Sequence, residues 1–482
     1  MERLTSFEVA EQQSDRSRAR ALLSEAKRTS FWLDDLGFPV EAPPLAGESS
    51  ADLVVVGGGY TGLWTALRAK ERYPDLDVVL IEAHRVSWAA SGRNGGFCEP
   101  SLTHGRSNAS THLPGEEPLL ARLGEENLAE LLAALDRYGI DCDVQPHGVI
   151  KLATEPHQEA AIRRLAATDP SVRVLADDQL QAEVRTAAAR VGGWATEEGV
   201  VLNPVKLARG LADACVALGV RIHENTAATR LRSLGHGRGV VVQTSHGRIT
   251  GRQVVLATNG FRSLLRRTRL FTVPVYDYAI VTEPLTPDQR AALGWQKAQG
   301  VTDLNSRFHY MRLLKDSAGR DRLLLGGYDA VYHFGRRVKP EYDISESTFE
   351  RLAVHMGVFF PQLADVKYTH AWGGMIDTCS RFFSFFTLAG HRQVAAAAGF
   401  TGLGVAATRF AADVMLDLLN GEDTERSRTK LVRKRPLPFP PEPFVWPAIR
   451  FTSAMMARSD RREGRRGLWL WMLQKCKVGF DS

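Results

Sequence analysis

The stretch from Leu53 to Leu63 reads LVVVGGGYTGL, and it decides the fold. Its four leading apolar residues, most of them β-branched, are typical of a short strand that is buried on both faces of a sheet. Apolar residues at helical spacing over residues 61–72 predict a helix directly after the glycines. The run VVLI at Val78–Ile81 predicts a second buried strand, so the segment as a whole predicts a β-α-β unit.

The glycines between the first strand and the helix form a GxGxxG motif. Gly57 permits a tight turn, Gly59 lets a pyrophosphate approach the backbone, and Gly62 allows the helix to pack closely on the strand. The free N–H groups at the start of the helix then favour the phosphate. Glu82 ends the second strand 20 residues after Gly62, where a carboxylate accepts hydrogen bonds from ribose hydroxyls. An acid at this position disfavours a 2′-phosphate, and therefore NADP.

This unit alone is compatible with either NAD or FAD. Two further glycine-rich segments favour FAD: Ser91–Phe97 reads SGRNGGF, and Gly399–Val405 reads GFTGLGV at the start of another predicted helix. A reduced flavin carries negative charge near N1–C2=O, and a helix N-terminus stabilises such charge.

Six segments together resemble one known family. They are GGGYTGL at Gly57–Leu63, LIEA at Leu80–Ala83, ASGRNGG at Ala90–Gly96, ATNG at Ala257–Gly260, WGG at Trp372–Gly374 and GFTGLGV at Gly399–Val405. The chain resembles the D-amino-acid-oxidase-type family of FAD-dependent amine and amino-acid oxidoreductases, and within it the gamma-glutamylputrescine oxidase-like branch. The likeness covers roughly residues 30–422 and does not identify one substrate.

The resemblance implies that FAD binds in an extended form, with its pyrophosphate at the first glycine turn, its ribose on Glu82 and its adenine near Ala228. The segment after the second strand would follow the ribityl chain, and the last glycine turn would face N1–C2=O. The implied cofactor residues are Gly57, Gly59, Tyr60, Thr61, Gly62, Glu82, Ala83, Ser91, Gly92, Arg93, Asn94, Gly95, Gly96, Ala228, Ala257, Thr258, Gly260, Gly399, Thr401, Gly402, Leu403, Gly404 and Val405.

The chain departs from its relatives at two positions. Relatives with covalent flavin carry a cysteine within the segment that here reads GMID at Gly374–Asp377, whereas the nearest cysteine of this chain is Cys379. We therefore expect non-covalent FAD. The last glycine turn often carries histidine where this chain has Leu403, which removes one hydrogen bond near the flavin ring.

The expected fold class is α/β (α+β overall), with a Rossmann-like FAD-binding domain of the glutathione-reductase type and a mixed, mostly antiparallel substrate domain. We assign residues 51–108, 192–272 and 367–422 to the FAD-binding domain, and residues 109–191 and 273–366 to the substrate domain. Residues 1–50 form a lead-in and linker, and residues 423–482 form a proline-rich connector and a basic tail.

Composition excludes several classes of protein. Hydrophobic residues make up 44% and charged residues 24%, which is the ordinary globular mixture and excludes a chain that is disordered throughout. The N-terminal residues lack the order of a signal peptide, and the five scattered cysteines contain no CxxC, so we expect a cytoplasmic protein with reduced thiols. The histidines show no metal-binding spacing, so no metal is expected.

The net charge of +6 is concentrated in the last part of the chain. Residues 421–482 hold 14 Lys/Arg and 7 Asp/Glu, so the other residues hold 61−14 = 47 basic and 55−7 = 48 acidic groups. This distribution disfavours nucleic-acid binding. The tail from Arg450 to Ser482 mixes arginine with tryptophan, which is compatible with an anionic membrane surface, a partner subunit or packing against the rest of this chain.

Amine oxidation in this family moves a hydride from the carbon next to nitrogen to flavin N5, and the imine product then hydrolyses. The protein supplies orientation, an apolar lid and electrostatics, so no strong base is required. The candidate substrate-pocket residues are Phe97, Tyr310, Arg312, Trp372 and Asp377, with Tyr276 and Tyr278 as further aromatic candidates. We expect Arg312 to pair with a substrate carboxylate and Asp377 to hold a substrate ammonium group, with turn capping as an alternative role for Asp377.

Two other functions stay open at this point. A flavin hydroxylase using NAD(P)H would need a second dinucleotide turn, and the sequence contains no second GxGxxG at a strand-to-helix junction. A non-catalytic dinucleotide-binding protein would not need both glycine turns. The substrate and the electron acceptor (oxygen, a carrier protein or a quinone) are not determined by these motifs.

Overall fold

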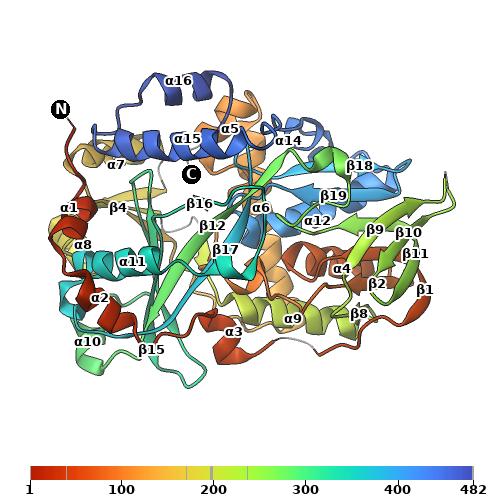
Figure 1. Cartoon of the computed structure of the whole chain (residues 1–482), viewed down its shortest axis with the longest axis horizontal. Coiled ribbons are helices and arrows are strands. Elements are labelled where there is room, and N and C mark those ends of the chain that lie inside the picture. Colours follow the sequence, from red (N-terminus) through yellow and green to blue (C-terminus); the bar gives the residue numbers. More distant parts are fainter. Residues whose placement is uncertain (1, 39–40, 170, 196–198, 236, 480–482) are drawn as a thin grey trace.

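The computed structural model describes residues 2–38, 41–169, 171–195, 199–235 and 237–479 (Figure 1). Two β-sheets lie side by side, and the first of them occupies the right half of that view. Its centre is parallel, in the order β19-β11-β1-β2-β8, and β18, β10 and β9 extend it by antiparallel pairing. The strands are β1 (Gly47–Val56), β2 (Val78–Ile81), β8 (Arg221–His223), β9 (Ala228–Ser233), β10 (Val240–Thr244), β11 (Gly247–Leu256), β18 (Phe385–Ala389) and β19 (Val394–Ala398).

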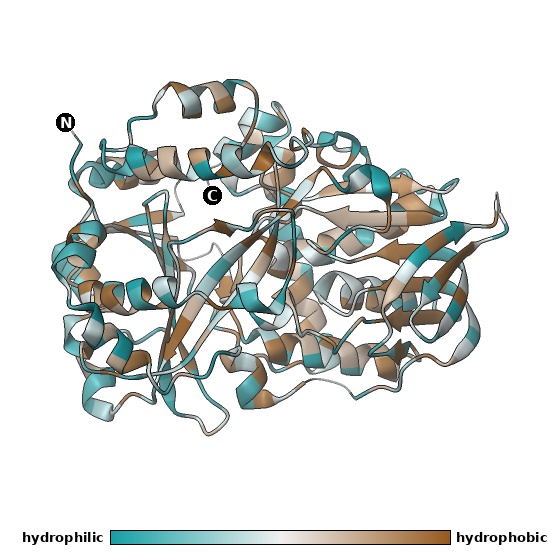
Figure 2. Ribbon diagram, viewed as in Figure 1, coloured by the Kyte–Doolittle hydropathy of each residue, from teal (hydrophilic) through white to brown (hydrophobic). Residues whose placement is uncertain are grey.

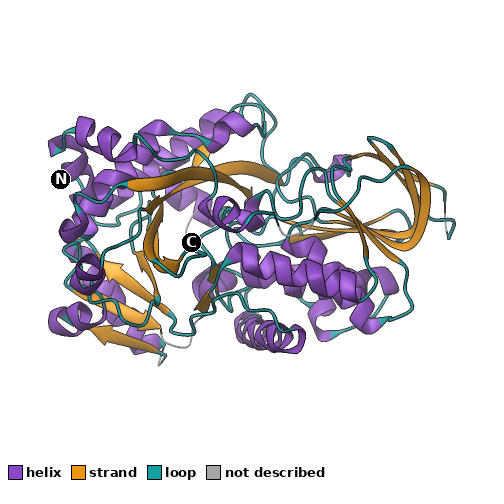
Figure 3. Ribbon diagram, turned by 90° about the horizontal axis from the view of Figure 1, so that it is seen from below, coloured by secondary structure: helices purple, strands orange, loops and turns teal. Residues whose placement is uncertain are grey.

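Helices cover one face of this sheet, as Figure 3 shows from below. The second half of β1 is buried on both faces, which explains its unbroken apolar sequence. Leu53 and Val55, on one face of this strand, share an apolar core with the covering helices. These helices are α4 (Tyr60–Arg72), α5 (Gly105–His112), α6 (Glu117–Tyr138), α9 (Pro204–Ala217) and α12 (Gly404–Asn420).

The second sheet is mostly antiparallel, in the order β16-β12-β15-β14-β13-β4-β6-β5, with β17 on the other side of β12. β4 and β13 are its parallel pair. The strands are β4 (Val149–Ala153), β5 (Val172–Leu175), β6 (Val191–Ala195), β12 (Thr272–Thr282), β13 (Gly300–Asp303), β14 (His309–Lys315), β15 (Asp321–Gly327), β16 (Val331–Tyr332) and β17 (Tyr368–Cys379). A short pair, β3 (Phe97–Cys98) and β7 (Val200–Val201), lies apart from both sheets.

A second apolar core lies against this sheet. N-terminal helices contribute Phe7 and Leu23 to it, both almost fully buried, and α11 contributes Phe349 and Phe359. The helices of this core are α1 (Ser6–Gln13), α2 (Arg16–Leu23), α8 (Asp177–Glu183) and α11 (Glu346–Phe359), whereas α3 (Phe31–Leu36) and α7 (Glu159–Thr168) pack in smaller clusters and α10 (Pro287–Ala292) has no buried residue. The expected α/β class with two unlike sheets is thus confirmed.

The domain boundaries expected from sequence differ from the sheets at four places. β6 and β17 pair within the second sheet, although residues 192–272 and 367–422 were expected to belong with the first. Helix α6 packs in the first core, although residues 109–191 were expected to belong with the second. Residues 1–50 are more than a linker, since they contribute α1–α3 to packed cores and begin β1. Pairing partners far apart in sequence decide these boundaries, and local motifs do not report them.

The C-terminal segment is helical and lies along the top of Figure 1. It contains α13 (Glu425–Arg428), α14 (Lys430–Arg433), α15 (Val445–Asp460) and α16 (Leu468–Lys475). Figure 2 shows brown, hydrophobic residues concentrated in the strands of the first sheet, whereas α16 mixes brown and teal residues. Among the described residues, no helix combines the length and the apolar character that a bilayer span requires.

Candidate functional site

A cavity of about 1820 Å³ lies where the two sheets meet. Typical small-molecule pockets have volumes of ~300–1,000 Å³, so this cavity is nearly twice as large as the upper end of that range. It therefore has room for an extended dinucleotide and a substrate together. Residues of both sheets line it, and so do residues of the C-terminal helices. Apolar surface predominates in its lining.

The first glycine turn opens one end of this cavity. Gly57 has φ +116°, a region that L side chains rarely adopt, and a Cβ there would collide with the carbonyl oxygen of Ala257. A Cβ on Gly59 would lie 2.9 Å from Ser91 Oγ. A Cβ on Gly62 would collide with the carbonyl oxygen of Gly57. Only glycine fits these positions, and the first N–H groups of α4 consequently face the cavity with little cover.

Glu82 follows β2 directly and lines the same end of the cavity. Its carboxylate accepts hydrogen bonds from the backbone N–H groups of Gly58 (2.6 Å) and His84 (3.0 Å) and from Trp88 Nε1 (3.1 Å). Burial raises the pKa of Glu82, and these three donors oppose that rise. A carboxylate has about four acceptor sites, so one of them is left for a ligand hydroxyl.

The segment after residue 88 is braced by its own side chains. Ser91 Oγ accepts from Tyr60 N at 3.0 Å, which ties the segment to the start of α4. Asn94 donates to two backbone carbonyls of residues 90–91 and accepts from Gly96 N at 2.9 Å. Arg93 points to the second sheet, where its guanidinium donates to the carbonyl of Gly373 in β17 at 3.1 Å, and it also bonds Asp343 at 2.6 Å. The segment is therefore a rigid wall of the cavity.

The second glycine turn, before α12, lines the cavity as well. Asp377 is 2% exposed, and its carboxylate accepts the backbone N–H groups of Gly399 and Phe400. Burial raises the pKa of Asp377 to about 7, against the effect of these donors. Asp377 thus caps this turn, the alternative role expected for it, and it also lines the cavity. The turn has Thr401 and Gly402 at positive φ, which presents the N-terminus of α12 to the cavity.

A histidine lies beside this turn, although Leu403 stands where relatives often carry one. His104 Nε2 donates to the carbonyl of Thr401 at 2.7 Å, and its ring lies 3.8 Å from where a Cβ of Gly402 would be. Burial lowers the pKa of His104, so the ring is neutral and its Nδ1 is an acceptor. Sequence reasoning missed it because it belongs to a segment 297 residues from Thr401.

The side chains expected at the substrate gather around Gly95. Tyr310 packs against Gly95 and against Phe97, with ring centroids 5.8 Å apart. Its hydroxyl donates to Asp277 Oδ2 at 2.8 Å. Trp372 also lines the cavity and is fixed by a 2.9 Å bond from Nε1 to the carbonyl of Arg93. These groups form a mainly aromatic pocket with one carboxylate in it.

Asp277 is the residue of this pocket that the sequence analysis missed. Burial raises its pKa to about 6, and the hydrogen bond from Tyr310 works against that rise. The signal available in sequence was an acid in the middle of the apolar strand VPVYDYAIV at 273–281. Of the two tyrosines beside it, Tyr278 lines the cavity, whereas Tyr276 packs against His333 and Tyr342 away from it.

The expectation for Arg312 needs correction. Its side chain is 2% exposed, lies beneath the turn at Gly95 and Gly96, and does not line the cavity. The guanidinium donates to the carbonyls of Leu202 (2.5 Å) and Gly95 (3.4 Å), and burial lowers its pKa to about 10. Arg312 therefore supports the turn and cannot reach a substrate carboxylate.

The remaining expected cofactor residues divide into two groups. Those lining the cavity are Gly57, Gly59, Tyr60, Thr61, Glu82, Ala83, Ser91, Arg93, Asn94, Gly95, Ala228, Ala257, Thr258, Thr401, Gly402, Leu403, Gly404 and Val405. Those lying behind it, where they allow close backbone packing, are Gly62, Gly92, Gly96, Gly260 and Gly399.

Comparison with known proteins agrees with this arrangement. Residues 52–418 match the family described as FAD dependent oxidoreductase (DAO). The chain belongs to this family. It is 31% identical to gamma-glutamylputrescine oxidoreductase of Escherichia coli K12, over 78% of this chain and 85% of the relative. Among solved structures, glycine oxidase from Geobacillus kaustophilus superposes with a TM-score of 0.63 at 21% identity, covering 78% of this chain and 96% of the other. L-proline dehydrogenase from P. horikoshii superposes equally well, at 0.63 with 16% identity, 79% and 96% coverage.

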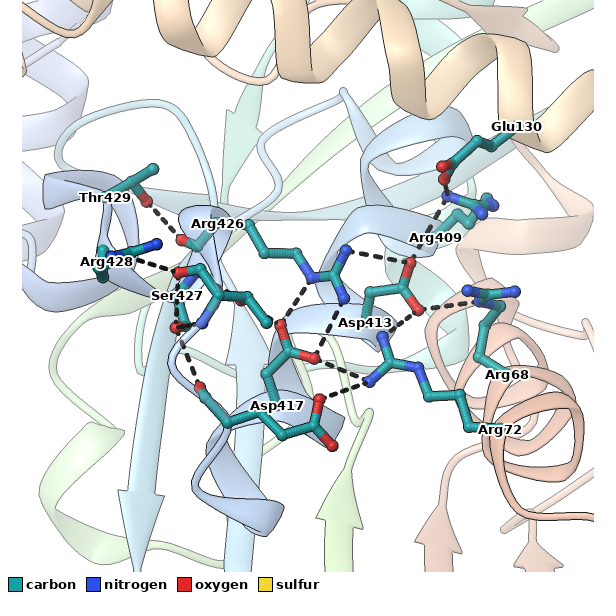
Figure 4. A network of polar contacts seen from close by, with 12 residues as sticks. Arg68, Arg72, Glu130, Arg409, Asp413, Asp417, Arg426, Ser427, Arg428 and Thr429 are labelled. Atoms are coloured by element: carbon teal, nitrogen blue, oxygen red, sulfur yellow. Dashed lines mark hydrogen bonds and ion pairs between the residues drawn. The ribbon is translucent and has the colours of Figure 1, made fainter.

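The residues present fit FAD. The N-termini of α4 and α12 face one cavity, and the Gly57 and Gly62 positions exclude any side chain from the path of the pyrophosphate. Glu82 is placed for a ribose, and Ala228 lines the cavity near it. This FAD-dependent oxidoreductase holds both helices in place with one ion-pair network, shown in Figure 4.

The network joins α4 to α12 behind the cavity. Asp413 bonds Arg68 (2.9 Å) and Arg72 (2.7 Å), and Asp417 bonds Arg72 and Arg426 at 2.7 Å each. Asp413 is 3% exposed as a side chain and Asp417 is 0% exposed. Burial alone would raise the pKa of Asp413, but the surrounding arginines hold it below its ordinary value. The relative position of the two helix N-termini is thus fixed by charges further along the same two helices.

Proposed function

We propose that this enzyme oxidises a C–N bond of a small amine or amino acid, and that its FAD is held non-covalently. The observation that carries this proposal is the pocket around Gly95, where Tyr310, Asp277 and Phe97 adjoin the wall expected to hold the flavin. When bound, FAD supplies the hydride acceptor. The product imine would leave the pocket and hydrolyse to a carbonyl compound.

Each pocket residue has a distinct part in this proposal. Phe97 and Trp372 provide an apolar wall that keeps water from the reacting carbon. Asp277 accepts hydrogen bonds from the substrate nitrogen, and Tyr310 holds the Asp277 carboxylate in position through its 2.8 Å bond. This assignment favours cationic amines, since the arginine expected to bind a carboxylate lies outside the cavity.

Non-covalent binding is supported by the position of Cys379. Its thiol is fully buried, donates to the carbonyl of Phe383 at 3.1 Å, and does not line the cavity. Among the described residues that line the cavity there is no cysteine. We expect FAD to be released when the protein is denatured in acid. A cytoplasmic location stays a prediction from the sequence.

The proposal is tested by anaerobic absorbance titration of the purified yellow protein. The first compound to add is gamma-glutamylputrescine, the compound named for the Escherichia coli relative. Putrescine, glycine, sarcosine and D-amino acids follow as separate additions. Bleaching of the flavin band by one of them supports amine oxidation, and readmitting air shows whether oxygen is the acceptor. Bleaching by NAD(P)H alone would overturn the proposal in favour of a hydroxylase.

A further inference from the structure

The C-terminal helices α15 and α16 form a cover with two different faces. The inner face lines the cavity through Ile449, Met456, Trp469 and Leu473. The cover is joined internally by a 3.0 Å bond from Trp469 Nε1 to Thr452 Oγ1. The inner face thus accounts for only part of the apolar residues in this segment.

The cover is attached to the N-terminal helices by ion pairs and a backbone bond. Arg461 bonds Glu8 at 2.6 Å, Arg458 bonds Glu2 at 2.6 Å, and Arg3 N donates to the carbonyl of Arg461 at 2.8 Å. These contacts hold the end of α15. They leave the outward side of α16 open to solvent.

The outer face of α16 carries large apolar side chains. Leu468 is 80% exposed, Trp471 52% and Met472 41%, and Phe451 of α15 is 48% exposed nearby, with its ring 5.2 Å from that of Trp469. Single exposed apolar residues are common on protein surfaces, but a group on one short helix marks an interaction site. The helix spans Leu468–Lys475, so it is far too short to cross a bilayer.

The same region is strongly basic. Between residues 445 and 479 the basic residues are Arg450, Arg458, Arg461, Arg462, Arg465, Arg466, Lys475 and Lys477, and the acidic ones are Asp460 and Glu463. The excess is therefore six positive charges, whereas the chain before residue 421 is nearly neutral. Lys475 and Lys477 are exposed, and Lys475 Nζ lies 5.8 Å from the centroid of the Trp471 ring.

We propose that α16 and the basic loop at residues 461–467 dock on an anionic phospholipid surface. Leu468, Trp471 and Met472 would enter the boundary between headgroups and acyl chains, while the lysines and arginines contact lipid phosphates. A protein partner fits less well, because the eight basic residues against two acidic ones give this face a net positive charge that suits anionic lipid headgroups. The proposal does not rest on the proposed function.

Docking in this way would place the cover of the cavity against the bilayer. The inner and outer faces belong to the same two helices. A contact on the outer face would therefore affect the position of the side chains that line the cavity. The enzyme would therefore meet its membrane through the element that closes its own site.

The test is co-sedimentation of the purified holoenzyme with vesicles of phosphatidylcholine alone and of an equimolar mixture with phosphatidylglycerol. We expect binding to the anionic vesicles, which added salt weakens, and little binding to the neutral ones. K475Q/K477Q should bind about 25-fold more weakly, at about fivefold for each cation removed. R230Q/R232Q removes the same charge from β9, far from α16, and should bind as the native protein does.

The apolar part is tested with W471S against V216S, because Trp471 and Val216 are both 52% exposed and Val216 lies on α9. W471S should lose anionic-vesicle binding, whereas V216S should keep it, with unchanged flavin content showing that both proteins are folded. Equal binding to neutral and anionic vesicles, or equal losses in the paired variants, would overturn the proposal. A dimer in gel filtration that W471S converts to monomer would also overturn it, since a second copy of the chain would then cover this face.

Discussion

The two ends of the cavity are built in different ways. At the cofactor end, backbone N–H groups at the starts of α4 and α12 face the cavity, and glycines leave room for them. At the substrate end, side chains from β12, β14 and β17 provide the surface, including Tyr310, Asp277 and Trp372. A backbone site tolerates almost no change at its glycines, whereas a side-chain site changes its specificity residue by residue.

The largest effect is expected from Gly57→Ala, which breaks the backbone-built end. The collision with Ala257 costs about 1–3 kcal/mol as overpacking, and the left-handed φ costs about 1–2 kcal/mol more. We expect purified protein with little or no FAD, measured by flavin absorbance relative to protein. Gly219→Ala is the matched control, because Gly219 has φ +84° with nothing near its Cβ position. Equal FAD contents in the two variants would contradict the role assigned to the close approach.

Asp417→Asn tests the support behind the same end. Arg72 and Arg426 would lose their charged partner in a buried network, which typically costs about 3 kcal/mol. We expect a lower free energy of unfolding in urea and faster FAD dissociation. Asp365→Asn removes a carboxylate whose side chain is 91% exposed, and it should change the unfolding free energy by less than about 1 kcal/mol. A lower free energy of unfolding with no change in the rate of FAD dissociation would show that the network does not support the cofactor site.

Asp277→Asn tests the side-chain end. Loss of a charged hydrogen-bond acceptor typically costs about 1.5–3 kcal/mol, so kcat/KM should fall by about 10- to 100-fold while FAD content stays unchanged. With a pKa of about 6, native Asp277 should produce a rise of kcat/KM as the pH passes 6, and the variant should lack that rise. Tyr310 and Asp329 are the neighbours that affect this pKa. An unchanged pH profile would exclude Asp277 from the reaction.

The smallest effect concerns Asp377, which caps the second glycine turn at the cofactor end. Its pKa rises from 3.8 to about 7 on folding, so the folded state binds more protons than the unfolded state between those values. Its contribution to stability is therefore fully present below pH 3.8 and is lost as the pH rises to about 7. Urea unfolding across this range should show a difference between Asp377→Asn and the native protein that changes with pH. A constant difference would mean that Asp377 does not titrate there.

The sequence predicted the fold class and the family because the glycine positions have steric requirements that appear at fixed spacing. The same reasoning favoured FAD through the turns at Gly57 and Gly402. It did not find Asp277, whose place depends on the pairing of β12 with β15 and β17. It misplaced Arg312, because the alternation of a strand says which residues share a face and does not say what lies over that face.

The position of α12 in the chain has a consequence for how the protein is made. Tyr60 and Gly404 begin the two cofactor-facing helices and are 344 residues apart, and α4 packs mainly against α12. At roughly 5–20 residues per second, the ribosome releases the second helix on the order of tens of seconds after the first. During that interval the apolar side of α4 has no permanent partner in α12. The nascent chain therefore exposes a surface of the kind that chaperones bind, and the site that is encoded first is completed nearly last.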